Sequence, residues 1–92
     1  MPVVTLTSDF GLSDYYAAVI KGAMLCKNQD IDIVDISHNV NPYDIVQGAF
    51  ILKNAYESFP EGTIHILSVN NYYTETPTFL AIRHEGHYFI GP

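Results

Sequence analysis

The sequence is poor in cysteine and in basic residues, and each shortage excludes a class of protein. A single cysteine among 92 residues cannot form a disulfide within the chain, which favours a reducing compartment. Four Lys and Arg residues stand against ten Asp and Glu residues, so the formal net charge is -6. Nucleic acids and anionic membranes need clustered positive charge, whereas these four residues are scattered. We therefore expect no nucleic-acid or membrane partner.

Long apolar runs and the common catalytic signatures are also missing. No apolar stretch approaches the length of about 20 residues that a membrane helix needs, and no cationic segment precedes an apolar one as in a signal peptide. The glycine loops that bind phosphates, the nucleophile elbow of hydrolases and the HExxH zinc motif are absent. We expect a cytoplasmic protein without these chemistries.

The length of the chain is enough for one small domain or for a part of a larger one. The sequence is 48% hydrophobic, which is typical of a packed chain rather than a disordered one. It stops at Gly91 and Pro92, directly after a predicted strand and without a closing helix. We therefore expect residues 1–92 to be a fragment of a larger domain.

Apolar runs and helical periodicities predict the order βαβαβ followed by a β-hairpin. The predicted strands cover residues 3–7, 31–36, 63–69, 79–83 and 87–90. Right-handed crossovers would place the first three strands in one parallel sheet with the helices packed on it, a three-layer α/β arrangement.

The two predicted helices have recognisable starts. Ser13 is a candidate N-cap for the first, and Asn41 followed by Pro42 for the second. The apolar face of the first helix includes Val19 and Cys26, which predicts a buried structural thiol rather than a reactive one.

Polar residues follow the three strands of the predicted parallel sheet. They are Thr-Ser-Asp at residues 7–9, Ser-His-Asn at 37–39 and Asn-Asn at 70–71. Because open parallel sheets bind ligands outside the carboxyl ends of their strands, these three segments predict one crevice for a polar ligand.

Asp9 is the first candidate for ligand binding. A carboxylate that leaves a strand before a helix can accept two hydrogen bonds from a vicinal diol, such as the hydroxyls of a ribose. Gly11 would allow a close backbone approach or a positive φ angle. The alternative is a turn carboxylate that binds its own loop amides, and for an isolated Asp-x-Gly the residues alone favour that alternative.

Histidines and tyrosines supply the other candidates. His38 is either an acid or base or, as is more common, a hydrogen-bonded structural residue. No histidine has metal-ligand spacing to another His, Cys or carboxylate, so we expect no metal site. Five tyrosines near the predicted crevice either stack on a ligand or are simply half-buried: Tyr15, Tyr16, Tyr43, Tyr72 and Tyr73.

Residues 5–16, TLTSDFGLSDYY, resemble the opening of the S-adenosyl-L-methionine (SAM) hydroxide adenosyltransferase family, which is related to the SAM-dependent chlorinases and fluorinases. The similarity continues through residues 21–22, 33–38, 42–45, 48–50, 59–65 and 88–92. Because it extends along nearly the entire chain with consistent spacing, it is specific. It implies that residues 1–92 are the N-terminal part of a SAM-binding α/β domain.

The resemblance implies an activity, an assembly and a set of site residues. The resemblance implies a homotrimer in which SAM is enclosed between this α/β domain and the C-terminal β-rich domain of a neighbouring subunit. That second domain is absent from this chain. Hydroxide attacks the ribose C5′ and gives adenosine and L-methionine, without a metal or redox cofactor. Asp9 would hold the ribose hydroxyls, and Phe10, Tyr43 and Tyr73 would line the substrate site.

One segment departs from the family pattern. After the third strand the family carries Val-Asp-Pro-Gly-Val-Gly-Thr and then arginines, and its Asp and an Arg orient the water together with a downstream His. Here Asn70 takes the place of that Asp, and residues 70–78 contain no arginine. An amide cannot serve as a carboxylate base, and Glu75 is a candidate substitute.

The residues therefore leave more than one function open. The leading interpretation is a SAM hydrolase with Asn70 in the catalytic position. The alternative, which Asn70 favours, is a catalytically silent module that binds SAM or adenosine. A third is that the isolated fragment has no site, because half of the pocket belongs to other sequence. Halogenation is less favoured, because halide pockets depend on residues that this fragment does not contain.

Overall fold

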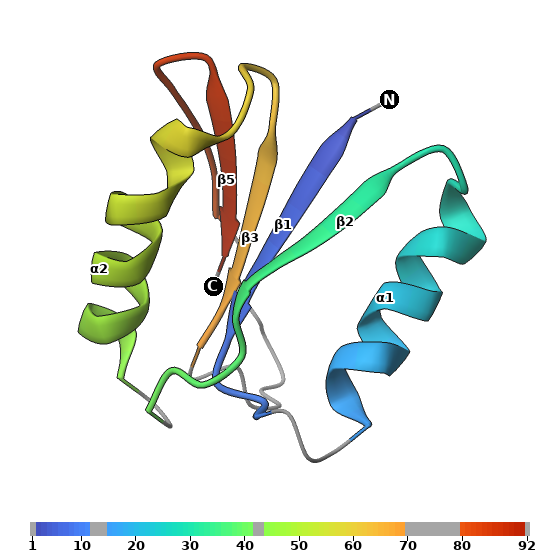
Figure 1. The fold of residues 1–92 in the computed structure, drawn as a ribbon, viewed down its shortest axis with the longest axis horizontal. Helices are drawn as coiled ribbons and strands as arrows, with labels where there is room; N and C mark the ends of the chain where they lie inside the picture. Colours follow the sequence, from blue (N-terminus) through green and yellow to red (C-terminus); the bar gives the residue numbers. More distant parts are fainter. Residues whose placement is uncertain (1, 12–14, 42–43, 70–79, 92) are drawn as a thin grey trace.

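The computed structural model describes residues 2–11, 15–41, 44–69 and 80–91. These residues form an α/β fold built on a five-stranded sheet (Figure 1). In chain order the elements are β1 (Val3–Ser8), α1 (Tyr16–Lys27), β2 (Asp32–Ser37), α2 (Ile45–Ala55), the short 3-10 helix η1 (Tyr56–Ser58), β3 (Ile64–Ser68), β4 (Leu80–His84) and β5 (His87–Gly91).

The sheet has the strand order β2-β1-β3-β5-β4. Strand β1 lies between β2 and β3 and pairs in parallel with both, as the sequence predicts. The predicted hairpin is also confirmed, since β4 and β5 pair antiparallel, and β5 continues the sheet by pairing in parallel with β3. Glu85 and Gly86 connect the hairpin with φ angles of 49° and 81°, the conformation that a two-residue turn requires.

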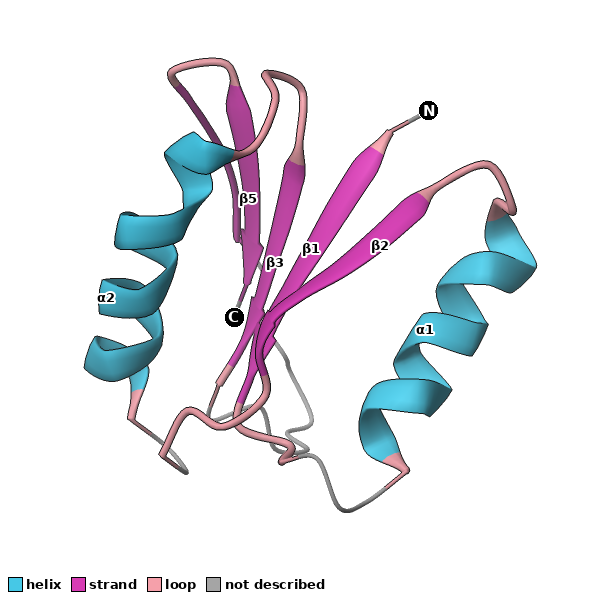
Figure 2. Cartoon of the chain, in the orientation of Figure 1, coloured by secondary structure: helices cyan, strands magenta, loops and turns pink. Residues whose placement is uncertain are grey.

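The two helices lie on opposite faces of the sheet (Figures 1 and 2). The crossover from β1 to β2 runs one way along the sheet, and the crossover from β2 to β3 runs the other way. Right-handed crossovers in opposite directions put their helices on opposite faces, which produces three layers. Among the described residues, neither helix is long and apolar enough to span a membrane.

Both helices begin later than the sequence predicts. Tyr15 is the N-cap of α1 and makes no capping hydrogen bond through its side chain, so the prediction of Ser13, which lies outside the described residues, was wrong. Asp44 is the N-cap of α2, because its carboxylate accepts the Gln47 N–H at 2.9 Å. Asn41 instead belongs to the turn before the helix, where its C=O accepts the Asp44 N–H.

The prediction of a buried Cys26 was also wrong, since this side chain is exposed. The half-buried stripe of α1 consists of Ala17, Ile20, Lys21 and Met24. Cys26 follows Met24 by two positions, and two positions turn a side chain to the other side of a helix.

Helix α2 approaches the sheet closely at Gly48. A Cβ atom at this position would lie 3.0 Å from Val69 Cγ2 and 3.2 Å from Leu67 Cδ1. Gly22 of α1 is the contrasting case, since a Cβ atom there would meet no described atom within 4 Å. The absence of a side chain at Gly48 therefore sets the distance between α2 and the sheet.

Gly48→Val is expected to lower the free energy of unfolding by about 1–3 kcal/mol, because the added methyl groups must displace Val69 and Leu67. Chemical denaturation of the full-length protein, with and without the substitution, measures this change. Gly22→Val is the matched control and should change the free energy of unfolding by less than about 1 kcal/mol. Equal destabilisation by the two substitutions would contradict the close packing of α2.

A chain of buried polar side chains crosses the α2 face of the sheet. His65 is fully buried, with Nδ1 2.7 Å from Thr5 Oγ1 and Nε2 3.1 Å from His87 Nδ1. Its ring stacks on Phe89, and the ring of Tyr56 packs edge-on against His87. Burial, together with a smaller effect of the neighbouring His87, lowers the pKa of His65 to about 4. The core therefore holds His65 in its neutral form.

Candidate functional site

Two of the three predicted polar segments, residues 7–9 and 37–39, meet at one edge of the sheet, and the third, residues 70–71, lies outside the described residues. Ser8 ends β1, and Ser68 ends β3 beside it in register. His38 follows the end of β2 and reaches across to β1, where its Nδ1 lies 2.5 Å from Ser8 Oγ. A cavity of about 160 Å³ lies here between α1 and the sheet, with Ser8, Phe10, His38 and Ser68 in its lining. Two serines and an imidazole thus line this space at the carboxyl ends of the strands, together with apolar side chains such as Ile20 and Ile66.

Asp9 lies in the turn that leads out of β1 at this edge. The turn is closed by two backbone hydrogen bonds, from Gly11 N–H to His38 C=O at 2.6 Å and from Val40 N–H to Ser8 C=O at 3.3 Å. Gly11 has a φ angle of 79°, which only glycine adopts without strain, as the sequence analysis anticipated. The backbone on both sides of Asp9 is therefore fixed against the segment that follows β2.

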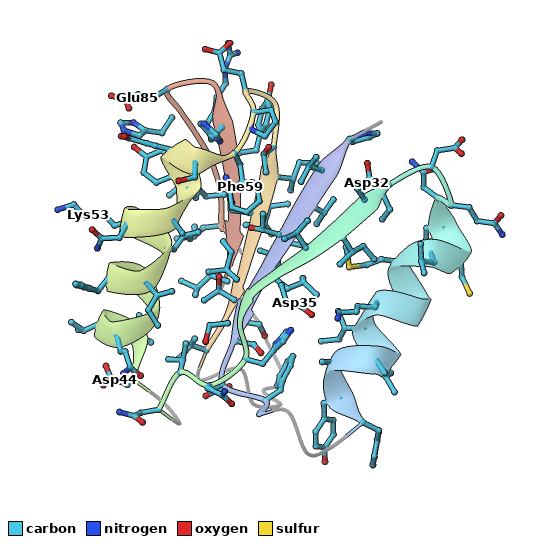
Figure 3. The ribbon with its side chains drawn as sticks, viewed as in Figure 1. Asp32, Asp35, Asp44, Lys53, Phe59 and Glu85 are labelled. Carbon is cyan, nitrogen blue, oxygen red and sulfur yellow. The ribbon has the colours of Figure 1, made fainter. Side chains whose placement is uncertain are left out.

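Four side chains form a continuous hydrogen-bonded chain behind this turn. Ser8 contacts His38, and His38 Nε2 lies 2.8 Å from Asp35 Oδ1. The other carboxylate oxygen of Asp35 accepts a hydrogen bond from Lys21 Nζ at 2.5 Å. Figure 3 shows Asp35 on the side of β2 that faces α1, from which Lys21 extends. The chain therefore joins β1, β2 and α1.

The electrostatics of this chain favour an ionised Asp35. Burial by itself would raise the pKa of Asp35, but the hydrogen bonds from Lys21 and His38 outweigh burial and hold the pKa below its ordinary value. The side chains of Lys21 and Asp35 are each about one-third exposed, whereas His38 is buried. The negative charge of Asp35 thus lies beside a buried imidazole.

Aromatic rings cover the outer side of the turn. The ring of Phe10 is stacked parallel to His38, with their centroids 6.4 Å apart, and lies 6.2 Å from the ring of Tyr16. Tyr15 and Tyr16 pack on each other at 4.8 Å, and both are at least half exposed. These rings are the described aromatic side chains nearest to Asp9 in sequence, and they offer an apolar surface beside a carboxylate.

The structure brings together only some of the predicted site residues. Asp9 and Phe10 lie at the predicted edge of the sheet, while Tyr43, Asn70 and Tyr73 lie outside the described residues. The expectation that His38 is a hydrogen-bonded structural residue agrees with its two side-chain contacts. The contact of Lys21 with Asp35 was not predicted, because Lys21 lies 14 positions before Asp35 and carries no local signal of the contact.

A larger hollow lies at the other end of the sheet, on the hairpin. Its volume is about 400 Å³, and its lining is mainly apolar, with Ile64, Ile82, Tyr88 and Ile90. It lacks the convergent polar groups that a site for a polar ligand needs. In the described part of the chain, no three His, Cys, Asp or Glu side chains are grouped to hold a metal ion. The smaller cavity, which the neighbours of Asp9, Ser8 and Phe10, help to line, is therefore the better candidate site.

These features define an α/β domain with a polar site at the carboxyl edge of a parallel sheet. Residues 4–92 match the family model of the SAM hydroxide adenosyltransferase N-terminal domain. The chain belongs to this family, as its resemblance in sequence predicts.

Relatives of known sequence extend beyond this chain. The (R)-S-adenosyl-L-methionine hydrolase of Methanocaldococcus jannaschii is 32% identical over 97 residues, which cover 100% of this chain and 36% of that protein. The fluorinase of Nocardia brasiliensis is 40% identical over 63 residues, which cover 68% of this chain and 21% of that protein. The chain therefore corresponds to about a third or less of these two relatives.

Solved structures agree with the fold. A conserved protein from Thermotoga maritima superimposes with a TM-score of 0.85 at 26% identity, over 98% of this chain and 35% of that one. A conserved protein from Thermus thermophilus gives a TM-score of 0.80 at 32% identity, over 100% of this chain and 38% of that one. Both similarities cover essentially every element described above.

Proposed function

We propose that this chain forms part of the substrate site of an enzyme that hydrolyses SAM to adenosine and L-methionine. The observation that carries the proposal is the turn that contains Asp9, which lies at the carboxyl edge of the sheet in a domain of this family. A carboxylate there suits a ribose, because its two oxygens can accept hydrogen bonds from both hydroxyls of the vicinal diol. The names of the hydrolase relatives add support for SAM as the substrate.

The proposed reaction is a displacement at the ribose C5′. The oxygen of a water molecule forms a bond to C5′ and gives up one proton to a base, for which Glu75 is the candidate, and the bond from C5′ to sulfur breaks. Its electron pair goes to sulfur, which leaves as the neutral thioether of methionine. A sulfonium is already a good leaving group, so the protein mainly has to align the water and exclude bulk solvent. This chemistry needs no metal or redox cofactor.

The proposed roles of the other residues follow the same chemistry. Phe10 lies beside the cavity next to Asp9 and is suited to pack on the adenine or the thioether. We assign the corresponding roles to Tyr43 and Tyr73, and we place Asn70 beside the attacking water. An amide can orient a water molecule through hydrogen bonds, but it cannot accept the proton as a carboxylate does.

The alternative function is a catalytically silent module that binds SAM or adenosine. The observation that favours it is Asn70 in the position of the family Asp, together with the absence of arginine from residues 70–78. Both functions use the same binding site, so binding alone does not separate them.

Turnover and binding measured together separate the two functions. The full-length natural protein is incubated with SAM, products are identified by mass spectrometry, and adenosine binding is measured by calorimetry. Equimolar adenosine and L-methionine would support the hydrolase. Adenosine binding without product would support the silent module, and the absence of both would contradict both proposals.

Asn70→Asp is expected to raise the rate of SAM hydrolysis about 10- to 100-fold, because it restores a carboxylate that can accept the proton of the attacking water. Initial rates of adenosine release measure the change, and Asn71→Asp is the matched control with the same added charge. A rate that is unchanged in Asn70→Asp would show that this position does not face the water.

We further propose a cytoplasmic homotrimer. Apolar side chains on the outer sides of both helices support an assembly or further domains that cover them, since large exposed apolar patches are uncommon on isolated proteins. The most exposed of them on the helices are Val19, Val46 and Phe50. Sedimentation velocity of the full-length protein should give the mass of three subunits at micromolar concentration, and a monomer would contradict the proposal.

A further inference from the structure

His38 contacts the Asp9 turn on both sides of the carboxylate. Before Asp9, its ring nitrogen Nδ1 lies 2.5 Å from Ser8 Oγ. After Asp9, its ring is stacked parallel to that of Phe10, and its C=O accepts the Gly11 N–H at 2.6 Å. One buried histidine thus contacts three of the residues that surround Asp9 in the turn.

The hydrogen bonds around His38 are consistent with a single arrangement of donors and acceptors. Asp35 is ionised and can only accept, so His38 Nε2 carries the proton in its 2.8 Å contact with Asp35. In that arrangement Nδ1 is an acceptor, and the hydroxyl of Ser8 donates to it. The lone pairs of Ser8 Oγ then accept the Phe10 N–H at 3.3 Å. Every donor in the chain has an acceptor, from the turn to the carboxylate.

Lys21 extends this chain to α1. Its Nζ donates to the Asp35 oxygen that His38 leaves available. No residue of α1 is buried, so packing alone holds this helix weakly against the sheet. The ion pair with Asp35 is therefore a specific link between α1 and β2, and it also orients the carboxylate toward His38.

Ser8, His38 and Asp35 have the composition of a catalytic triad, but their geometry does not suit a nucleophile. Ser8 is only 1% exposed, and its oxygen already accepts the Phe10 N–H. A nucleophilic serine needs access to its substrate and donors for an oxyanion. The chain instead holds the backbone of the turn, which is the function of a positioning group.

We infer that His38, oriented by Asp35 and Lys21, is the positioning residue that fixes the Asp9 carboxylate for binding the ribose diol. The inference rests on the proposed function, because it concerns the nucleoside that the function requires. Binding groups must be held within about 0.5 Å of their productive geometry to act fully. Loss of the chain should therefore weaken recognition of the two ribose hydroxyls more than recognition of the base.

The test compares adenosine with 2′,3′-dideoxyadenosine, which lacks both hydroxyls, by calorimetry on the full-length natural protein. His38→Ala should weaken adenosine binding about tenfold, and Asp35→Asn and Lys21→Met about threefold. His38→Asn should recover part of the loss, because its amide can still reach Ser8. Affinity for 2′,3′-dideoxyadenosine should stay within about twofold in Asp35→Asn and Lys21→Met, which keep the His38 ring beside Phe10. His84→Ala and Lys27→Met, at exposed positions, are the controls.

The outcomes separate the inference from the proposed function. Equal losses for the two nucleosides would overturn the inference, because they would indicate a general structural role. Unchanged adenosine affinity in Asp35→Asn would also overturn it, and this variant keeps the test valid if His38→Ala fails to fold. The inference would also be overturned if His38→Ala weakened adenosine binding by the same factor in an Asp9→Ala background. If the natural protein binds neither nucleoside, the proposed function fails and the inference with it.

Discussion

Asp9→Asn is expected to weaken adenosine binding by about 1.5–3 kcal/mol, which is the contribution of hydrogen bonds to a charged group. This corresponds to an affinity loss of about 10- to 150-fold. The substitution keeps the size of the side chain and the backbone hydrogen bonds of the turn, but it removes the charge that the ribose hydroxyls would contact. Isothermal titration of the full-length protein with adenosine measures the effect.

Asp32→Asn is the matched control for Asp9→Asn. Asp32 begins β2, is exposed and lies at the end of the sheet away from the candidate site (Figure 3). Asp32→Asn removes the same charge from the protein as Asp9→Asn, so it also controls for the change in net charge. Equal affinity of Asp9→Asn and the natural protein would remove Asp9 from the ribose site.

Acidification is expected to destabilise the protein through His65. Its pKa is about 4 in the folded state and about 6.5 when the chain is unfolded, so the unfolded state binds more protons between these values. The contribution of His65 to stability is therefore intact above about pH 6.5 and is lost progressively as the pH falls towards 4. By linkage the loss amounts to about 3 kcal/mol, which is a large fraction of the stability of a small domain.

Urea denaturation between pH 7 and pH 4.5 measures this loss. His65→Gln should flatten the pH dependence, because the amide does not titrate and can still bond to Thr5 or His87. His84→Gln, at an exposed position of the hairpin, should leave it unchanged. An equal pH dependence in His65→Gln and the natural protein would show that groups other than His65 account for it.

The order of elements could be predicted from the sequence because each depends on local pattern. The β-branched run at residues 3–7 and the turn at Glu85 and Gly86 are sufficient to predict a strand and a hairpin. The start of α2 could not be predicted, because Asn41 and Asp44 are both good capping residues. Only the bond from Gln47 N–H to Asp44 decides between them.

The candidate site was predictable in part for a related reason. Asp9 follows a strand and precedes a glycine, so its place at the carboxyl edge follows from local pattern and the parallel sheet. The links of Asp35 to Lys21 and of His38 to Ser8 join residues 14 and 30 positions apart. They depend on the register that sets Leu6 beside Asp35 and on the rotation of α1, neither of which a local pattern specifies.

The exposure of Cys26 has a comparable physical cause. Apolar residues occur on more than one side of α1, and Val19 is 58% exposed although it is strongly hydrophobic. Periodicity therefore does not identify the face that meets the sheet. In a longer or assembled protein such a helix can have a second covered face, which would explain why both sides are apolar.

The most direct test of the central claim is hydrolysis of SAM by the full-length natural protein in water enriched in ¹⁸O, with both products analysed by mass spectrometry. Attack of water at the ribose C5′ predicts equal amounts of adenosine and L-methionine, with one ¹⁸O atom in the 5′-hydroxyl of adenosine and none in methionine. Adenosine without the label, or no adenosine although SAM binds, would contradict the account.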